Sequence, residues 1–400
     1  MKYANRMNQM TASEIREILK VTEQKQVISF AGGLPDPELF PVNEFLTAAN
    51  YVLKESGSQG LQYSTTEGFE PLRMQIANRM NSKFQSQITK DDVLIVNGAQ
   101  QALDMSGKLF LDKGDLIVCE SPTYLGAINA FRTYECRFIS VLTEDEGMSL
   151  SHLEETLKAH PDIRMIYVIP DFQNPTGRRW SLERRKRFMD LISCYDIPVI
   201  EDNPYGEIVF DNQIFPSLKK WDKNNQVISL GTFSKIFCPG LRVGWISASQ
   251  EILNRYILLK QSSDLHTSNL SQRQISKYLE LFDIEAHIRK LILAYRNKRD
   301  IAVSAIKKCF PADIKYTMPE GGLFLWIELP ESRSSRELLE VCIKENVAFV
   351  PGEAFYPNGE KKNAFRLNFS NADAEKLKEG ISKIGGIIGR YHSAAIYETI

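Results

Sequence analysis

Seven short apolar runs between residues 93 and 248 constrain the fold of this chain more than any other feature. They are VLIVN (93–97), LIVCE (116–120), FISVL (138–142), MIYVI (165–169), PVIED (198–202), VISLG (227–231) and VGWISA (243–248). Most are separated by stretches with helical periodicity, such as QQALDMSGKLFL and LERRKRFMDLISCY. Apolar strands that alternate with helices indicate βαβ units around a sheet buried on both faces. The last two runs are too close for a helical crossover, so we expect an antiparallel pairing there.

The segments on either side of these runs predict a division of the chain into three parts. Thr11-Ala-Ser-Glu14 is a capping-box pattern that predicts a first helix, and the Gly- and Pro-rich ISFAGGLPDPELFP after it predicts an extended segment. Beyond about residue 250, a long helical region precedes alternating strands in GGLFLWIELP and FRLNFS. We therefore expect an N-terminal segment (1–45), a large α/β domain (46–290) and a smaller α+β domain (291–400).

Composition excludes several classes of function. The 49 basic and 50 acidic residues are balanced and form no long basic patch, so we expect neither a nucleic-acid nor a membrane partner. The first residues, MKYANRMNQM, lack an apolar signal core, so we expect no signal sequence, and no run approaches the roughly 20 apolar residues that cross a bilayer. Six scattered cysteines favour reduced thiols in the cytoplasm, and five histidines without metal-binding spacing argue against a catalytic metal.

Candidate functional residues follow the predicted strands, where ligands gather in α/β proteins. GAQQAL at 98–103 could hold a phosphate with free helix amides, although an ordinary tight turn has the same pattern. Later strands are followed by Asn174, by Asp202 and Tyr205, and by Thr232, Ser234 and Lys235. Neither an ATP P-loop nor a dinucleotide fingerprint is present in the sequence. Each signal is weak alone, because Asn-Pro forms plain turns and a carboxylate at a strand end often caps a helix.

Taken together, these residue types suit a phosphorylated, protonatable aromatic aldehyde. A lysine with a depressed pKa can form a Schiff base with the aldehyde. A carboxylate facing the ring nitrogen keeps that nitrogen protonated, which makes the ring an electron sink. Hydroxyls, backbone amides and an arginine would hold the phosphate.

Ordered motifs along the chain carry a family resemblance. NPTG, EDNPY, GTFSKIFCPGLRVGW and FRLNFS, in that order, resemble fold type I pyridoxal-phosphate enzymes, and among these the class I/II aminotransferases. SEIREILK, LQYSTTEG, DLHTSN and PEGGLFLW are similar to the 2-aminoadipate (LysN-like) and kynurenine aminotransferase group. The resemblance spans roughly residues 10 to 370. It implies a mainly parallel seven-stranded sheet with one antiparallel strand in the large domain, and pyridoxal 5'-phosphate as cofactor.

The resemblance also implies a role for each matching residue. Lys235 would carry the cofactor aldehyde, Asp202 would pair with the ring nitrogen, and Asn174 and Tyr205 would bind the ring oxygen O3′. Tyr124 would stack on the ring. The phosphate would be held by Ala99, Gln100, Thr232, Ser234 and Arg242.

Further implied roles concern the substrate and a second subunit. Arg366 would grip the substrate α-carboxylate, helped by Asn174 and the backbone near Gly33. The alternation in AFRLNFS agrees, because Arg366 lies on the strand face opposite Phe365 and Leu367. A surface ion pair is the alternative for this arginine. Tyr63 would reach the phosphate in the neighbouring subunit, so the resemblance implies a homodimer; simple packing is the alternative for Tyr63 and Tyr124.

The substrate is less constrained than the cofactor. Arg16 matches an arginine that contacts acidic side chains in aminoadipate-type enzymes, but with Lys20 it would equally form a solvated basic face. We expect an aminotransferase for 2-aminoadipate-like or for aromatic, branched and acidic amino acids, with 2-oxoglutarate as acceptor. A carbon–sulfur β-lyase or another enzyme on the same fold is an alternative. A cofactor-sensing regulator fits less well, because only about a dozen residues precede the expected first helix.

Overall fold

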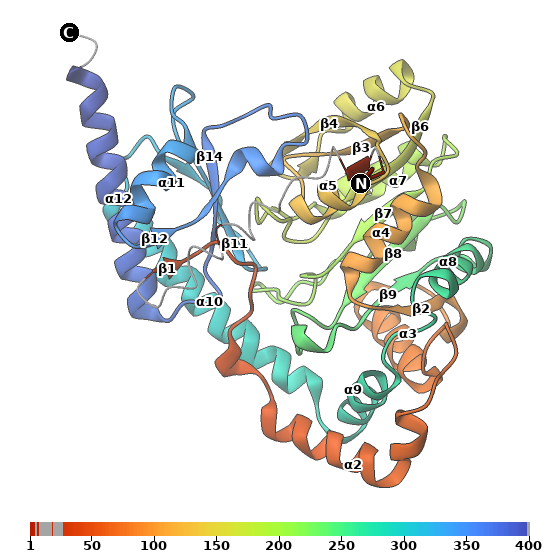
Figure 1. The fold of residues 1–400 in the computed structure, drawn as a ribbon. Coiled ribbons are helices and arrows are strands. Elements are labelled where there is room, and N and C mark those ends of the chain that lie inside the picture. Colours follow the sequence, from red (N-terminus) through yellow and green to blue (C-terminus); the bar gives the residue numbers. More distant parts are fainter. Residues whose placement is uncertain (5, 8–17, 19–26, 398–400) are drawn as a thin grey trace.

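The computed structural model describes residues 1–4, 6–7, 18 and 27–397. The capping box at Thr11 and the candidate substrate residue Arg16 lie outside the described residues. Figure 1 shows a layered α/β part built on one large sheet, and beside it a smaller α+β part that contains the C-terminal helix. The long helix α10 (Ile284–Cys309) runs between the two parts.

The large sheet has eight strands in the order β2-β9-β8-β7-β6-β3-β4-β5. Their bounds, in the same order, are Val93–Val96, Gly244–Ser247, Val227–Thr232, Val199–Asp202, Ile163–Val168, Leu116–Ser121, Arg137–Glu144 and Gly147–Met148. All seven predicted runs are strands, and β9 is antiparallel to β8 as expected. It is also antiparallel to β2, a pairing that was not predicted. The prediction of seven strands missed β5, a two-residue edge strand antiparallel to β4, because two residues carry no periodic pattern.

Alternate side chains of each central strand enter two different hydrophobic clusters, which explains the continuous apolar runs. In β3, Ile117 and Cys119 pack on one face, and Leu116 and Val118 pack on the other. The first face is covered by α4 (Ala99–Phe110), α5 (Leu125–Arg132) and α8 (Gln250–Ser263). The second face is covered by α6 (Leu150–Ala159) and α7 (Leu182–Ile192). The sheet is therefore buried on both sides.

The strand order changes direction at β3. The chain passes from β3 to β4 towards one edge of the sheet, whereas β6, β7 and β8 follow one another towards the opposite edge. Loops on either side of such a switch point leave a crevice at the carboxyl ends of the strands. Asp202 is the last residue of β7, and the loops after β3, β6, β7 and β8 carry Tyr124, Asn174, Tyr205 and Lys235. The topology therefore directs these residues towards one place.

The smaller part is built on a four-stranded sheet in the order β10-β11-β14-β13. Its strands are Lys315–Tyr316, Phe324–Glu328, Ala364–Asn368 and Val350–Pro351. The smaller part also contains the helices α11 (Ser335–Lys344) and α12 (Ala374–Tyr397). In addition, β1 (Ile28–Ser29) pairs in parallel with β12 (Val347–Ala348). Three further helices, α2 (Val42–Gly60), α3 (Glu70–Phe84) and α9 (Asn269–Leu281), lie beside the β2 edge of the large sheet (Figure 1). Because α10 continues through residue 290, the expected domain boundaries stay a prediction.

Candidate active site

A cavity of about 360 Å³ lies at the carboxyl ends of the large-sheet strands. Twelve of the fourteen residues proposed from the sequence line it: Gly33, Ala99, Gln100, Tyr124, Asn174, Asp202, Tyr205, Thr232, Ser234, Lys235, Arg242 and Arg366. They come from segments separated by more than 300 residues and from both sheets. Of the remaining two, Arg16 lies outside the described residues, and Tyr63 does not line the cavity.

Lys235 follows β8 in a turn whose neighbouring residues, Ser234 and Ile236, are buried. Its Nζ donates a hydrogen bond to the backbone oxygen of Gly33 at 2.7 Å. Burial first, and then the guanidinium groups of Arg366 and Arg242, lower the pKa of Lys235 to about 8, although Asp202 opposes this shift. The amine is therefore easier to deprotonate than an ordinary lysine, as a nucleophile or a general base requires.

Asp202 ends β7 and is buried beneath the cavity. Its Oδ2 accepts a hydrogen bond from the Tyr167 hydroxyl at 2.8 Å, while its buried Oδ1 has no hydrogen-bond partner among the described residues. Burial raises the pKa of Asp202 to about 7, although the Tyr167 hydrogen bond and the charge of Lys235 lower it. A buried carboxylate oxygen without a donor is a place for an N–H group of a ligand.

Two tyrosines line the walls of the cavity. Tyr205 meets the ring of Phe324 edge to face, with centroids 5.7 Å apart, and burial raises its pKa. Tyr124 precedes α5, and burial raises its pKa as well. A Cβ atom at Gly126 would lie only 2.4 Å from Cζ of Tyr124, so this glycine leaves the space that the ring occupies.

Hydroxyls, helix amides and a guanidinium converge at one end of the cavity. The Thr232 Oγ1 donates to Ser234 Oγ at 2.8 Å and accepts from the Ser234 amide at 3.1 Å. Ala99 and Gln100 open α4 after Gly98, and the first amides of a helix have no partner within it. A Cβ at Gly98 would lie 2.5 Å from Nη2 of Arg242, so the guanidinium packs directly on this turn. The set has the donors that a phosphate needs.

Arg366 lies in the middle of β14 and is 0% exposed, which excludes the alternative of a surface ion pair. Nη1 donates to Oδ1 of Asn174 at 2.7 Å, and Nη2 donates to the backbone oxygen of Ala31. The guanidinium lies over the rings of Phe324 and Phe355 at 4.3 and 5.0 Å. Burial lowers its pKa to about 10. A buried cation without a carboxylate among its described partners is suited to an anionic ligand.

Tyr63 lies away from the cavity and is 78% exposed. Its ring meets the imidazole of His266 edge to face at 5.8 Å. The single chain therefore presents Tyr63 outward instead of towards its own Lys235.

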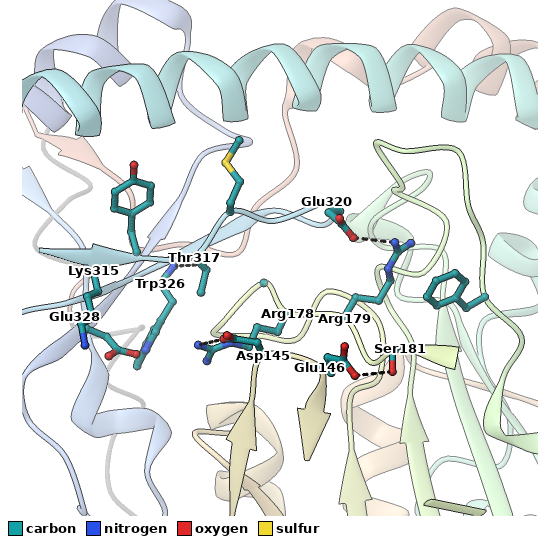
Figure 2. A pocket seen from close by; sticks show the side chains of 14 residues that line it. Asp145, Glu146, Arg178, Arg179, Ser181, Lys315, Thr317, Glu320, Trp326 and Glu328 are labelled. Carbon is teal, nitrogen blue, oxygen red and sulfur yellow. Dashed lines mark hydrogen bonds and ion pairs between the residues drawn. The ribbon is translucent and has the colours of Figure 1, made fainter. Parts of the chain in front are cut away.

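A larger groove of about 640 Å³ lies elsewhere, between the 177–181 segment and the strands β10 and β11 (Figure 2). Its arginines are paired, since Arg178 contacts Asp145 at 3.0 Å and Arg179 contacts Glu320 at 2.8 Å. None of the residues proposed from the sequence lines this groove. Size alone therefore does not identify the active site, and the convergence of chemical groups does.

Sequence reasoning missed Tyr167 as the partner of Asp202. Tyr167 lies in β6, which pairs with the strand that carries Asp202. A tyrosine within the apolar run MIYVI was an available signal, because a buried hydroxyl needs a hydrogen-bond partner. Among the described residues, no group of three or more His, Cys, Asp or Glu side chains is placed to hold a metal. No described helix is both long and apolar enough to cross a bilayer.

The sheet topology, the lysine in the cavity, the Asp202 oxygen without a partner among the described residues, and the anion cradle together define a pyridoxal-phosphate-dependent enzyme of fold type I. The family model for aminotransferases of class I and II matches residues 25–384, and the chain belongs to this family. It is a transaminase that uses pyridoxal 5'-phosphate.

Named relatives resemble the chain over nearly its whole length. The aromatic-amino-acid aminotransferase 1 of Thermococcus litoralis is 44% identical over 95% of this chain and 92% of its own. The 2-aminoadipate transaminase of Thermus thermophilus is 41% identical over 94% of this chain and 93% of its own. The crystal structure of a multiple substrate aminotransferase from Thermococcus profundus superimposes with a TM-score of 0.93 at 39% identity, covering 98% of both chains. These relatives support transamination over the lyase and regulator alternatives.

Proposed function

We propose that this aminotransferase moves an amino group from an L-amino acid to a 2-oxo acid, with 2-oxoglutarate as acceptor. The donor is 2-aminoadipate-like or belongs to a broader aromatic, branched and acidic set. One observation supports the site residues above all: Lys235, Asp202 and Arg366 line one cavity, and Oδ1 of Asp202 has no hydrogen-bond partner in the described part of the chain.

The residues of the cavity fit pyridoxal 5'-phosphate. When bound, this cofactor supplies an electron-withdrawing ring that stabilises negative charge at the substrate Cα. Asp202 would pair with the ring nitrogen and keep it protonated, and Asn174 and Tyr205 would bind the ring oxygen O3′. Ala99, Gln100, Thr232, Ser234 and Arg242 would hold the phosphate.

Lys235 and Arg366 act on the substrate. Arg366 binds the α-carboxylate through a charge-assisted pair of hydrogen bonds, with Asn174 and the backbone near Gly33 completing the clamp. Lys235, whose pKa is lowered to about 8, removes the proton from Cα with its neutral amine. Because Arg366 is fully buried and Lys235 is partly buried, their electrostatic effects are stronger than they would be in water.

The first test replaces Lys235 by Ala in the cofactor-loaded enzyme. We expect loss of the visible absorption due to the lysine-bound cofactor and a fall in turnover of several orders of magnitude, since the base and the anchor are lost together. Retention of wild-type turnover by Lys235→Ala would contradict the assignment. Exposed Lys186 on α7 offers a matched control, because Lys186→Ala should leave both signals unchanged.

The substrate range calls for a half-reaction screen. The loaded enzyme is mixed in turn with 2-aminoadipate, glutamate, leucine and phenylalanine, and the loss of aldehyde-form absorption is followed. If Arg16 selects acidic side chains, Arg16→Gln slows the response to 2-aminoadipate and glutamate but not to leucine. Equal slowing for all four amino acids would remove Arg16 as a selector.

We further propose a homodimer in which Tyr63 reaches the phosphate of the partner's cofactor. Tyr63 is exposed in the single chain, and exposed Leu61 and Leu265 offer apolar surface for a contact. All six cysteines are free thiols, which supports a cytoplasmic location.

A further inference from the structure

Lys260 of α8 is a buried cation that the proposed function does not use. Its side chain is 0% exposed, and burial lowers its pKa although Asp264 opposes this shift. The Nζ donates to both carboxylate oxygens of Asp264, at 2.9 and 3.0 Å, and to Oε1 of Gln101 at 3.0 Å. Burying a charged amine costs free energy unless the charge is paired and hydrogen-bonded, so the partners of Lys260 need to be identified.

The ion pair holds both ends of the turn that begins α4. Asp264 Oδ2 also accepts from Nδ2 of Asn97 at 2.5 Å and from Nε2 of Gln101 at 2.7 Å. Oε1 of Gln101 accepts from the Asn97 amide at 2.8 Å as well. Asn97 and Gln101 lie on either side of Ala99 and Gln100, which open α4 and line the cavity at the proposed phosphate site.

Asp264 also begins a second segment, residues 264–266, which contacts the loop that carries Tyr63. Asp264 directly follows α8 and precedes His266, whose Nε2 accepts from the Ser64 amide at 3.3 Å. The His266 ring also meets Tyr63. The segment that follows Asp264 therefore supports Tyr63, which we assign to the partner's phosphate.

We propose that Lys260 and Asp264 are positioning residues for the cofactor phosphate, which they do not touch, because they fix the Asn97–Gln101 turn. This inference rests on the proposed phosphate cradle. A buried ion pair is rarely required for stability, and apolar residues of similar size often replace one without loss. The pair therefore sets the geometry of the amides and of Arg242, whose Nη2 lies 3.5 Å from the Asn97 backbone oxygen.

The experiment compares two ligands that differ only in the phosphate. Cofactor-free wild-type protein and the double variant Lys260→Met/Asp264→Leu are titrated with pyridoxal 5'-phosphate and with pyridoxal. We expect the dissociation constant for pyridoxal 5'-phosphate to rise about tenfold or more, because amides and guanidinium lose their alignment. The constant for pyridoxal should change by less than about twofold, since it makes no phosphate contacts.

Controls separate this inference from the function on which it rests. Arg242→Ala should reduce the preference for the phosphorylated ligand, and Lys158→Met, which breaks an exposed pair with Glu154 at the same spacing, should not. If Arg242→Ala reduces the preference for pyridoxal 5'-phosphate over pyridoxal but the double variant does not, the positioning role alone is overturned. An unchanged preference in both would also remove the proposed cradle. If the double variant does not fold, Asp264→Asn, which keeps the side-chain shape, replaces it under the same criteria, with the melting temperature of the cofactor-free protein as the check.

Discussion

Asp202 illustrates how a single residue can serve function at the expense of stability. Its carboxyl group is buried, one oxygen has no donor among the described residues, and its pKa is raised from 3.8 to about 7. Below about pH 7, the folded, cofactor-free protein therefore favours the neutral carboxyl group. Between these two pKa values the folded state binds more protons than the unfolded state, so stability falls as pH rises through this window.

We predict that Asp202→Asn removes this pH dependence in the cofactor-free protein. Asparagine has nearly the same shape but does not ionise, so the penalty for a buried carboxylate disappears. At pH 8 the variant should melt at a higher temperature than wild type, and at pH 4 the difference should vanish. Thermal unfolding followed from pH 4 to 8 measures both, with exposed Asp196→Asn as the control. A parallel pH profile for wild type and Asp202→Asn would contradict the raised pKa.

At the level of elements, Gly126 near the start of α5 leaves the space that the Tyr124 ring occupies. Replacing glycine by alanine inside a helix ordinarily stabilises it by about 1 kcal/mol. At Gly126 the new Cβ would meet the Tyr124 ring, whereas at Gly389 of α12 it would meet nothing within 4 Å. The two substitutions are chemically identical and differ only in this neighbour.

We predict that Gly126→Ala weakens cofactor binding, because the Tyr124 ring must move from the cavity wall. Gly389→Ala should leave cofactor affinity unchanged and maintain or raise the melting temperature. Titration of the cofactor-free proteins with pyridoxal 5'-phosphate gives the comparison. Equal affinities for the two variants would show that the position of Tyr124 does not matter for binding.

The strands could be predicted from the sequence more completely than the contacts between residues of different elements. Buried parallel strands produce continuous apolar runs, so all seven long strands were found, and the residues that follow them were placed at one edge. The contact between Asn174 and Arg366 depends on the packing of two sheets and came only from the family resemblance. Lys260 and Asp264 are spaced like an ordinary surface pair on a helix, and only tertiary packing shows that the lysine is buried.

For the whole molecule, the proposed dimer gives a complementation test. If each site combines Lys235 of one subunit with Tyr63 of the other, a mixed dimer of Lys235→Ala and Tyr63→Ala subunits has one site with both changes. Its other site is then fully wild type. Mixing the two variants under conditions of subunit exchange should raise turnover above that of Tyr63→Ala alone.

Independent sites would behave differently, because mixing would then only dilute the Tyr63→Ala activity with inactive chains. Sedimentation of each variant confirms that both assemble to the same extent. A second mixture, Lys235→Ala with Lys158→Met, serves as reference for dilution without complementation.

The buried position of Arg366 has an evolutionary consequence. It is assigned to the α-carboxylate, the one anion that every α-amino acid shares, and its contacts with Asn174 and Ala31 involve no residue assigned to substrate selection. Substitutions elsewhere in the cavity wall can then change which side chains are accepted without altering the chemistry at Cα. Enzymes with this architecture can therefore change their amino acid specificity by gradual mutation. Two relatives about 40% identical to this chain are named for different substrates.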